Sequence, residues 1–385
     1  MTRIEAPKQL RTKSYVRGFT HSLYRYPAAA PPELIREIIE SHSQPGDLIL
    51  DPFMGGGTTI VEAVAHGRRA LGVDANTLAL FVTRAKTTPL SAAAWAGMDR
   101  WLASRPLRHP RLASERNPRW HGLPVALRNR VRSGLASLEA IDHPDAARMA
   151  RCCLLRLAQW SIESQGYVAH GGYVPTLPQM EDKLQRIVFS AREGMAELVA
   201  AARDHGYLKS HIVPARRLRV ASVWEPSSYD AVGETSSRVR LVLTSPPYPG
   251  VHVLYHRWQV ESRRETAAPY WITNTRDGFG ASYYTMGSRS ALGQENYFRR
   301  LSIAFSRIRH IMTRDGLVAQ LVAFNNPEIQ LPLFLAAMDQ AKFELAVPLR
   351  RIQRDMTRDV PNRRWYARDR ASGSGREVLL LHRLR

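Results

Sequence analysis

The chain has 385 residues, and its 55 lysines and arginines outnumber its 34 aspartates and glutamates, giving a net charge of +21. This excess is larger than solubility requires and favours a polyanionic partner. No apolar run approaches the length of a membrane helix, and the polar start predicts no signal peptide. The only two cysteines, Cys152 and Cys153, are too few for a disulfide framework, so we expect a cytoplasmic protein. The length allows two domains or one large domain with an insertion.

An apolar strand that enters a glycine loop stands near the N-terminus. Residues 48–59 read LILDPFMGGGTT, and a helical pattern follows over residues 60–67. Glycines let the backbone approach a ligand closely. The next strand, residues 69–73, ends in Asp74, where a carboxylate can accept hydrogen bonds from ribose hydroxyls. The pattern predicts a nucleoside-containing cofactor; because the spacing departs from GxGxxG, an ordinary strand-to-helix turn is the alternative.

Helical spacing dominates the middle of the chain, from residue 92 to about residue 202. A strand pattern returns at residues 212–220. We therefore expect residues 1–92 and 209–385 to build one catalytic domain, interrupted by a helical insertion at residues 93–208. The two cysteines lie in the apolar run 149–160 of this insertion, where core packing is expected.

Basic residues interleaved with aromatic residues form two clusters. Residues 100–132 contain nine arginines, and residues 350–370 contain eight. This mixture suits phosphate contact and base stacking, although a solvated surface is the alternative for any single arginine. Residues 251–258, 270–273 and 278–284 follow the strand at residues 241–244 and are rich in histidine, tryptophan and tyrosine. These stretches can wall a pocket or insert into a duplex. The predicted nucleic-acid contacts are Arg108, Arg111, Arg119, His252, His256, Arg257, Arg363 and Arg364.

His252 and His256 are spaced as on one face of a helix, which also suits a metal. No third ligand stands nearby in the sequence, so we predict no metal site.

The strand at residues 241–248, LVLTSPPY, ends in an unusual way. Each proline fixes its φ angle and lacks an N–H, so the chain leaves the strand as a stiff arm with unpaired carbonyls. The Pro246 carbonyl and the Ser245 hydroxyl can accept hydrogen bonds from an exocyclic amine of a nucleobase. Tyr248 offers a flat face for stacking on a flipped base. A simple turn at a Pro-Pro pair is the alternative.

Together these residues resemble the amino-methylating DNA methyltransferases that use S-adenosylmethionine. That family carries a D-P-F-x-G-x-G-T-T block and an (S/T/D/N)-P-P-(Y/F/W) block, matched here by DPFMGGGTT and TSPPY. The resemblance implies an α/β, Rossmann-like class I methyltransferase fold with a seven-stranded, mostly parallel sheet. The helix at residues 297–312 and the strands at 316–324 and 377–382 are expected to complete the sheet. The insertion lies where one class of the family has its target-recognition domain; a scaffold or a dimer surface is the alternative.

The resemblance also implies roles for individual residues. Asp74 is expected to bind the ribose, and Ser222 to lie near the adenine of the cofactor. The segment His21–Pro27 resembles an additional cofactor-binding segment. The implied cofactor-binding residues are His21, Tyr24, Asp51, Pro52, Phe53, Gly55, Gly57, Thr58, Asp74, Ala75, Ser222 and Thr244, and the implied catalytic residues are Ser245, Pro246, Pro247 and Tyr248.

The expected reaction is methylation of a base amine in double-stranded DNA. Within the family, Ser-Pro-Pro is associated mainly with the cytosine amine, so N4-methylcytosine is preferred over N6-methyladenine. Methylation of carbon 5 of cytosine is disfavoured, because it needs a thiolate, usually after a proline. An RNA base methyltransferase and a basic nucleic-acid-binding protein on a degenerate scaffold are the alternatives. A cognate restriction endonuclease is a possible partner, and the sequence leaves the oligomeric state open.

Overall fold

The computed structural model describes most of the chain. The described residues are 5–11, 18–26, 29–113, 123–163, 174–225, 229, 238–249, 258–260, 264–276, 284–288, 290–359 and 376–385.

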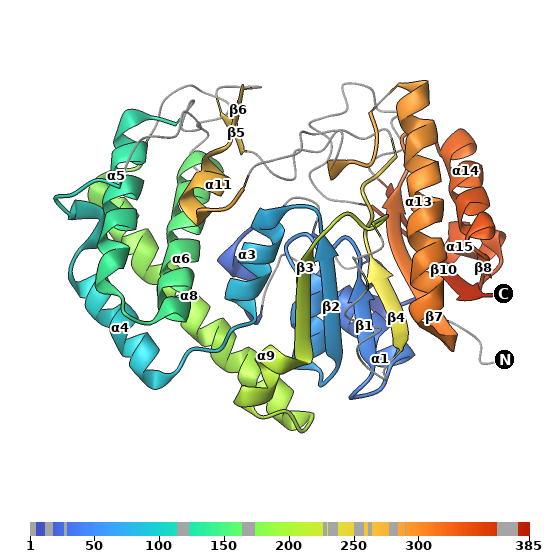
Figure 1. Ribbon diagram of the computed structural model, residues 1–385, viewed down its shortest axis with the longest axis horizontal. Helices are drawn as coiled ribbons and strands as arrows, with labels where there is room; N and C mark the ends of the chain where they lie inside the picture. The colour runs from blue at the N-terminus through green and yellow to red at the C-terminus, as the bar shows by residue number, and fades with distance from the viewer. Residues whose placement is uncertain are drawn as a thin grey trace.

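One sheet organises the molecule (Figure 1). The strand order is β3-β2-β1-β4-β7-β10-β8, and β9 pairs with β10. The pairs from β3 to β7 are parallel, whereas β10 is antiparallel to its neighbours. This confirms the predicted α/β class with a mostly parallel sheet, and the short β9 adds an eighth strand to the expected seven. The strands are β1 (Leu48–Asp51), β2 (Arg69–Asp74), β3 (Arg216–Val220), β4 (Val239–Thr244), β7 (Met312–Ala323), β8 (Phe343–Leu345), β9 (Thr357–Asp359) and β10 (Arg376–Leu384).

The sheet has a topological switch point between β1 and β4. From β1 the chain continues to β2 and β3 on one side, while β4, β7 and β10 build the other side. Loops after β1 and β4 therefore leave in opposite directions and open a crevice at the carboxyl ends of the strands. This crevice lies where DPFMGGGTT follows β1 and SPPY follows β4.

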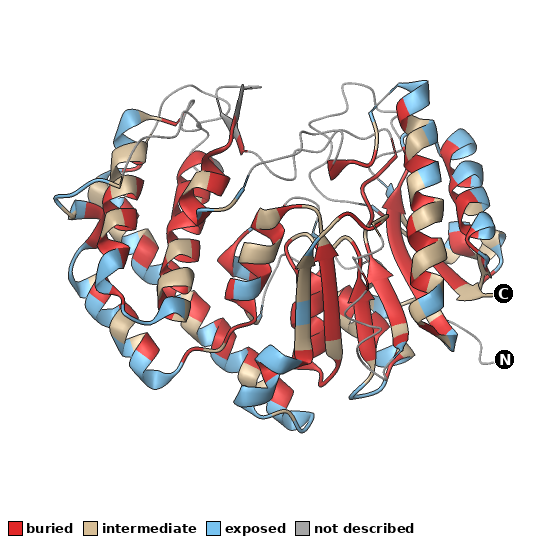
Figure 2. Ribbon diagram, in the orientation of Figure 1, coloured by how far each residue is buried: buried red, intermediate tan, exposed pale blue. Residues whose placement is uncertain are grey.

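Helices flank the sheet because each has an apolar face to bury. In α1, the side chains of Leu34, Ile35, Ile38 and Ile39 are buried, and this helix packs against α2. The central strands β1, β2 and β4 and the carboxyl half of β7 are largely buried, whereas the edge strand β3 is partly exposed (Figure 2). The helices on the sheet are α1 (Pro32–His42), α2 (Thr58–Ala65), α3 (Thr77–Lys86), α13 (Ala291–Ile311), α14 (Pro327–Gln340) and α15 (Leu349–Asp355), with 3-10 turns η1 (Lys8–Arg11) and η2 (His21–Leu23).

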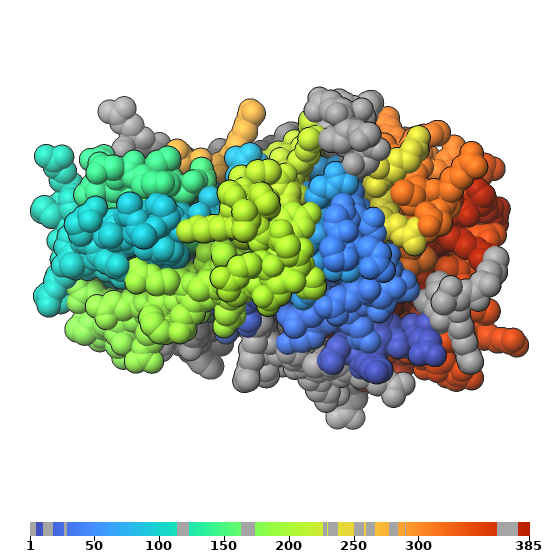
Figure 3. All heavy atoms as spheres, turned by 90° about the horizontal axis from the view of Figure 1, so that it is seen from below, coloured from blue at the N-terminus to red at the C-terminus, as the bar shows by residue number. Residues whose placement is uncertain are grey.

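The regular elements in the described part of the expected insertion are all helices, joined by turns and irregular segments. Its helices lie at one end of the molecule, away from β10 and β8 (Figures 1 and 3). Cys152 and Cys153 are fully buried in α6, as predicted. The outer boundaries near residues 92 and 208 stay predictions. The elements are α4 (Ala92–Ala103), η3 (Pro106–Arg108), α5 (Val125–Ala136), η5 (Ser137–Ala140), α6 (Pro144–Glu163) and α8 (Leu177–Asp204).

The strand expected at residues 212–220 begins later than the sequence pattern indicated. Residues Ile212–Ala215 form a short helix, α9, after the turn η6 (Lys209–His211), and β3 starts only at Arg216. Pro214 explains the difference, because proline has no N–H to donate to a strand ladder. The remaining elements are β5 (Trp258–Val260), β6 (Arg264–Thr266) and α11 (Ala268–Thr273). In the described part of the chain, no helix is both long and apolar enough to span a membrane.

Candidate active site

A pocket lies across the carboxyl ends of five neighbouring strands. It encloses about 920 Å³, including space open to solvent. Its walls come from the segments that follow β3, β2, β1 and β4, from β7, from Tyr26, Ala29, Ala30 and Ile35, and from Tyr284 and Met286. The carboxyl ends of parallel strands at a switch point are where sheets of this kind bind ligands. The two motifs that the sequence singled out thus open onto one cavity.

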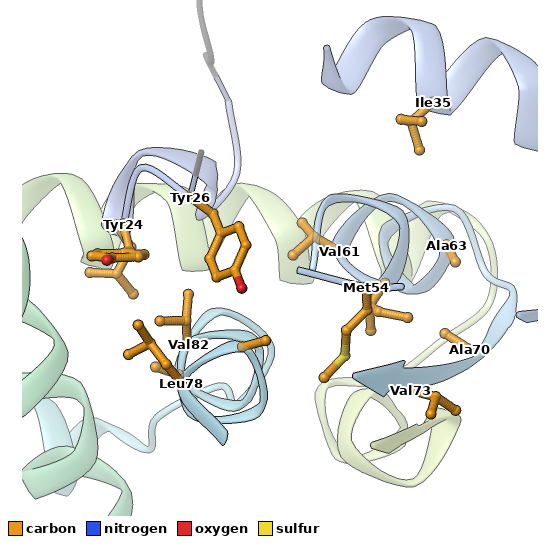
Figure 4. Packing of buried hydrophobic residues seen from close by; sticks show 14 of the residues in the cluster. Tyr24, Tyr26, Ile35, Met54, Val61, Ala63, Ala70, Val73, Leu78 and Val82 are labelled. Atoms are coloured by element: carbon orange, nitrogen blue, oxygen red, sulfur yellow. The ribbon is translucent and has the colours of Figure 1, made fainter. Parts of the chain in front are cut away.

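The glycine loop is shaped by close backbone contacts. Gly55 and Gly57 have φ angles of +48° and +76°, which favour glycine. A Cβ atom on Gly56 would lie 2.5 Å from Cβ of Tyr26, so no larger residue fits there. The same loop starts with Met54, whose side chain packs over Gly72 of β2 (Figure 4). The loop therefore lies close against both the sheet and the segment of Tyr26.

The carboxylate of Asp74, at the end of β2, is hydrogen-bonded to the glycine loop. One oxygen accepts a hydrogen bond from the Gly55 amide at 2.8 Å, and the other accepts one from the Asn76 amide at 2.8 Å. Each oxygen keeps lone pairs, and Asp74 lines the pocket. The arrangement can therefore take two vicinal hydroxyls of a ribose.

Asn76 joins the pocket to the residues behind it. Its side-chain amide donates to the Tyr26 hydroxyl at 2.9 Å, and its oxygen accepts from the Tyr270 hydroxyl at 2.9 Å. The same oxygen caps α3 by accepting from the Leu78 amide. Because Tyr26 and Asn76 both line the pocket, this buried chain of hydrogen bonds fixes one wall.

Asp51 and Thr244 connect the two motifs directly. The Thr244 hydroxyl donates to Asp51 Oδ1 at 2.6 Å, and the Phe53 amide donates to the same oxygen at 3.1 Å. Burial raises the pKa of Asp51 to about 6, although these hydrogen bonds act in the opposite direction. The Asp51 carboxyl group thus links the carboxyl end of β1 to that of β4 through a hydrogen bond.

A buried lysine supports the glycine loop from behind. Lys86 Nζ donates to the Gly56 carbonyl at 3.0 Å and to the Tyr24 carbonyl at 3.3 Å. Burial lowers the pKa of Lys86 to about 8. The lysine therefore ties the segment of residues 24–26 to the glycine loop.

The serine of the catalytic motif faces the pocket, but its tyrosine does not. Ser245 is partly buried, and its hydroxyl donates to the Leu321 carbonyl at 3.0 Å. Since that proton is engaged, the oxygen offers lone pairs to an amine. Tyr248 is only 1% exposed, and its hydroxyl donates to Glu377. Ser245 and Pro247 line the pocket, while Pro246 and Tyr248 lie behind its surface.

The opposite wall carries aromatic and apolar side chains. Ser222, Val223 and Trp224 follow β3, and Tyr284 and Met286 precede α13. The Arg300 guanidinium lies over the Trp224 ring at 4.8 Å from the ring centroid, and its Nη1 donates to the Met286 carbonyl. Arg300 therefore holds the two parts of this wall together.

Most of the predicted site residues come together at the pocket, and some do not. His21 is buried, where its Nε2 contacts Glu62 Oε1 at 2.7 Å beneath α2. Tyr24 is buried beside Tyr26, and its hydroxyl accepts from the Trp258 indole (Figure 4). Gly57 begins α2 behind the pocket surface. The predicted residues that line the pocket are Asp51, Pro52, Phe53, Gly55, Thr58, Asp74, Ala75, Ser222, Thr244, Ser245 and Pro247.

The sequence pattern missed several residues that line or support the pocket. Asn76 stands directly before a helical pattern, and asparagine is a preferred residue at the start of a helix. The sequence could therefore have identified Asn76 as a helix cap. Trp224 follows Ser222 closely, which is a weaker signal. Lys86 stands in no motif that indicates contact with the pocket. Tyr284 ends the stretch 278–284, which the sequence marks as a candidate wall, and Tyr26 lies in the segment His21–Pro27, although neither was predicted as a site residue. The other lining residues that were not predicted include Met54, Gly56, Asn76 and Trp224.

Cofactor affinity is expected to fall below about pH 6. Burial raises the pKa of Asp74 to about 6, so acid protonates the carboxylate and removes acceptors for ribose hydroxyls. Titration with S-adenosylhomocysteine between pH 5 and 8 measures this, and Asp74→Asn is expected to flatten the profile. Equal affinity of the unaltered chain at both ends of that range would contradict the assignment.

The same raised pKa values bear on stability in the opposite direction. Between about pH 4 and 6 the folded chain binds more protons at Asp51 and Asp74 than the unfolded chain does. Their contribution to folding is therefore present at low pH and is lost as the pH rises through about 6.

A second groove lies between the helical insertion and α11. It encloses about 1360 Å³, including open solvent, and its walls include Arg111, Arg151, Tyr270 and Trp271. Arg151 Nη1 donates to the Ile272 carbonyl at 3.0 Å, and no ion pair of Arg151 occurs among the described residues. Because the Tyr270 hydroxyl reaches Asn76, this groove adjoins the pocket wall that contains Asn76.

The predicted nucleic-acid contacts divide into three groups. Arg111 lies on the groove. Arg108 instead forms a forked ion pair with Glu181, with N–O distances of 2.7 and 2.9 Å. The others lie outside the described residues: Arg119, His252, His256, Arg257, Arg363 and Arg364. Within the described residues, no group of three His, Cys, Asp or Glu side chains is arranged to hold a metal.

Comparison with known proteins supports a relationship to DNA methylases. Residues 3–80 match the family model described as DNA methylase, of the N6/N4 type. Type II methyltransferase M.MvaI of Kocuria varians is 45% identical over 74 residues, which cover 18% of this chain and 16% of that protein. DNA adenine methyltransferase YhdJ of Escherichia coli is 39% identical over 61 residues, covering 16% of this chain and 21% of that protein. The matches thus span a small part of each relative and do not choose between cytosine and adenine.

A solved structure also aligns over most of the chain. The rRNA methyltransferase AviRa of Streptomyces viridochromogenes covers 94% of this chain and 89% of its own length, at 13% identity and a TM-score of 0.32. This likeness is too weak to carry an argument, and the assignment of the fold depends on the strand order described above.

Proposed function

We propose that the pocket binds S-adenosylmethionine and that the protein methylates the exocyclic amine of a base in double-stranded DNA. The observation that carries the proposal is that Asp74 and Ser245, from two separate motifs, line one pocket at the switch point of the sheet. The match of residues 3–80 to DNA methylases supports the same reading.

The residues of the pocket fit this cofactor. Gly55 and Gly56 pack closely against Tyr26, which sets the shape of the glycine loop, and the partly buried Asp74 carboxylate suits the ribose hydroxyls. We assign Ala75 and Ser222 to the adenine side, and we assign Asp51, Pro52, Phe53, Thr58 and Thr244 to the methionine side. When bound, the cofactor supplies a methyl group on a sulfonium sulfur.

The chain's own residues are proposed to position the amine. The Ser245 oxygen accepts one amine N–H, and carbonyls of the Pro-Pro turn accept another, which draws the lone pair back onto nitrogen. The nitrogen forms the new N–C bond as the S–C bond breaks, sulfur keeps that electron pair, and a proton leaves to solvent. No covalent bond to the protein is needed, so positioning and charge stabilisation supply the catalysis.

Cytosine is our preferred target because the motif carries serine at residue 245. The decisive experiment incubates the purified chain with S-adenosylmethionine and duplex DNA of varied sequence, followed by mass spectrometry of the nucleosides. N4-Methylcytosine is the expected product. N6-Methyladenine would keep the pocket but overturn the use of Ser245, and product on RNA alone would overturn the DNA assignment.

The nucleic acid is proposed to contact the groove beside α11. Arg111 and Arg151 supply positive charge there, and the Trp271 ring offers a stacking face. This places part of the substrate on the helical insertion, consistent with its proposed target-recognition role. A cognate restriction endonuclease is a further proposal, suggested by the type II names of several relatives.

Replacing Arg151 by glutamine is expected to weaken DNA binding and to lower the salt slope of log affinity by about 1, as for one lost phosphate contact. Cofactor affinity is expected to stay the same, since Arg151 lies outside the pocket. Fluorescence anisotropy at several salt concentrations measures both effects on DNA. Arg186→Gln, an exposed arginine of α8, serves as the control. An unchanged salt slope in Arg151→Gln would remove the groove from the DNA contact.

A further inference from the structure

Tyr248 is held away from the pocket by a buried carboxylate. Its side chain is 1% exposed, and its hydroxyl donates to Glu377 Oε1. The Ser245 hydroxyl lies 3.4 Å from the same tyrosine oxygen. A ring in this position does not offer its face to a base in the pocket.

Glu377 is itself fixed from the other side. Its Oε2 lies 3.0 Å from Arg358 Nε, and the two side chains are 6% and 7% exposed. Arg358 and Glu377 stand opposite each other in the β9–β10 ladder. The Tyr248 hydroxyl therefore binds the Glu377 carboxylate, whose charge Arg358 neutralises. Glu377 belongs to β10 and Arg358 to β9. Such a pair is costly to break once buried.

The SPPYP segment needs side-chain contacts of this kind. Pro246, Pro247 and Pro249 have no N–H to donate, so the backbone offers few hydrogen bonds of its own. The described hydrogen bonds of the segment occur near both of its ends. Ser245 donates to the Leu321 carbonyl in β7, and Gln330 Nε2 of α14 donates to the Pro249 carbonyl at 3.1 Å. Tyr248, which lies between Ser245 and Pro249 in the sequence, supplies a third contact, to Glu377 on β10.

We propose that Tyr248 anchors the catalytic turn through its hydroxyl, and that Glu377 and Arg358 are positioning residues for Ser245. The inference depends on the proposed function, because it gives these residues a role in placing the amine. The aromatic face for the base then comes from another residue. Four other rings line the pocket: Tyr26, Phe53, Trp224 and Tyr284.

The two roles of Tyr248 make different predictions for phenylalanine. A stacking role needs only the ring, and the family pattern accepts Tyr, Phe or Trp at this place. An anchoring role needs the hydroxyl. Tyr248→Phe is therefore expected to lower the single-turnover rate of methyl transfer roughly ten-fold or more, as when a hydrogen bond to a charged group is lost. Affinity for S-adenosylhomocysteine is expected to stay nearly unchanged, and the melting temperature is expected to fall by only a few degrees, as for one lost buried hydrogen bond.

Glu377→Gln gives the second arm of the test. Glutamine keeps an oxygen that can accept from the Tyr248 hydroxyl but removes the charge, so the rate is expected to fall less than in Tyr248→Phe, and the double variant is expected to be no slower than Tyr248→Phe alone. Tyr297→Phe alters another fully buried tyrosine, on α13, and serves as the control. If Glu377→Gln fails to fold, Tyr248→Phe alone decides.

Hydrogen exchange separates this inference from the proposed function. Amides of residues 241–248 are expected to exchange faster in Tyr248→Phe and Glu377→Gln than in Tyr297→Phe, whether or not methyl transfer occurs. Full activity of Tyr248→Phe together with unchanged exchange would overturn the anchor. Absence of methyl transfer in the unaltered chain, with the expected exchange pattern, would overturn only the proposed function.

Discussion

Replacing Asp74 by alanine is expected to lower the affinity for S-adenosylmethionine about 100-fold or more, while the chain stays folded. The carboxylate is the proposed acceptor for two ribose hydroxyls, and a hydrogen bond to a charged group contributes about 1.5–3 kcal/mol. It also holds the Gly55 amide, so its loss releases the glycine loop. Isothermal titration of the variant measures the effect.

Asp182→Ala is the matched control for Asp74→Ala. Asp182 is an exposed aspartate of α8 that pairs with Arg186. Its replacement is expected to leave cofactor affinity unchanged. If Asp74→Ala binds the cofactor as tightly as Asp182→Ala does, the ribose assignment is wrong.

Replacing Ser245 by alanine is expected to slow methyl transfer by about 100- to 1000-fold, the range seen when one group that stabilises transition-state charge is removed. The oxygen of Ser245 is the proposed acceptor that draws electron density onto the amine nitrogen. Affinity for the cofactor is expected to change little, because no assigned cofactor contact is lost. Single-turnover methyl transfer at saturating DNA and cofactor measures the rate.

Ser190→Ala provides the comparison for Ser245→Ala. Ser190 lies on α8, where its hydroxyl meets that of Ser22 at 3.2 Å on the surface. We expect this variant to keep its full rate. A Ser245→Ala protein that transfers methyl groups as fast as Ser190→Ala would show that the serine hydroxyl has no part in the reaction.

The sequence predicted the parts of the site that depend on strand ends. Asp51, Asp74 and Thr244 each end a buried strand, and parallel strands bring their carboxyl ends to one edge. The glycines after Asp51 were identifiable because a positive φ and close approach exclude other residues. Strand patterning and local backbone chemistry therefore sufficed to predict most of the pocket residues that lie at the strand ends.

The sequence could not predict the parts that depend on distant partners. Tyr24 and Tyr26 are the same type of residue two positions apart, so the sequence does not distinguish them. Only the contacts of Tyr26 with Gly56 and Asn76 place it in the pocket. Tyr248 was expected to face a base, but its partner Glu377 lies 129 residues away on another strand. Such pairs follow from the order of strands in the sheet, which no local pattern specifies.

His21 illustrates the same limit in a titratable group. The segment around it resembles a cofactor-binding segment, yet the ring contacts the fully buried Glu62 of α2, which Arg36 also contacts at 3.2 Å. Burial lowers the pKa of His21, although Glu62 acts to raise it. The residue fixes the packing of the N-terminal segment on α2, and Tyr26, five residues later, is the one that reaches the pocket.

Isothermal titration of the purified chain with S-adenosylmethionine tests the central claim most directly. We predict one molecule bound per chain at pH 8, weaker binding below about pH 6, and loss of binding in Asp74→Ala but not in Ser245→Ala. No binding to the unaltered chain, or binding that Asp74→Ala leaves intact, would contradict the placement of the cofactor at the switch point of the sheet.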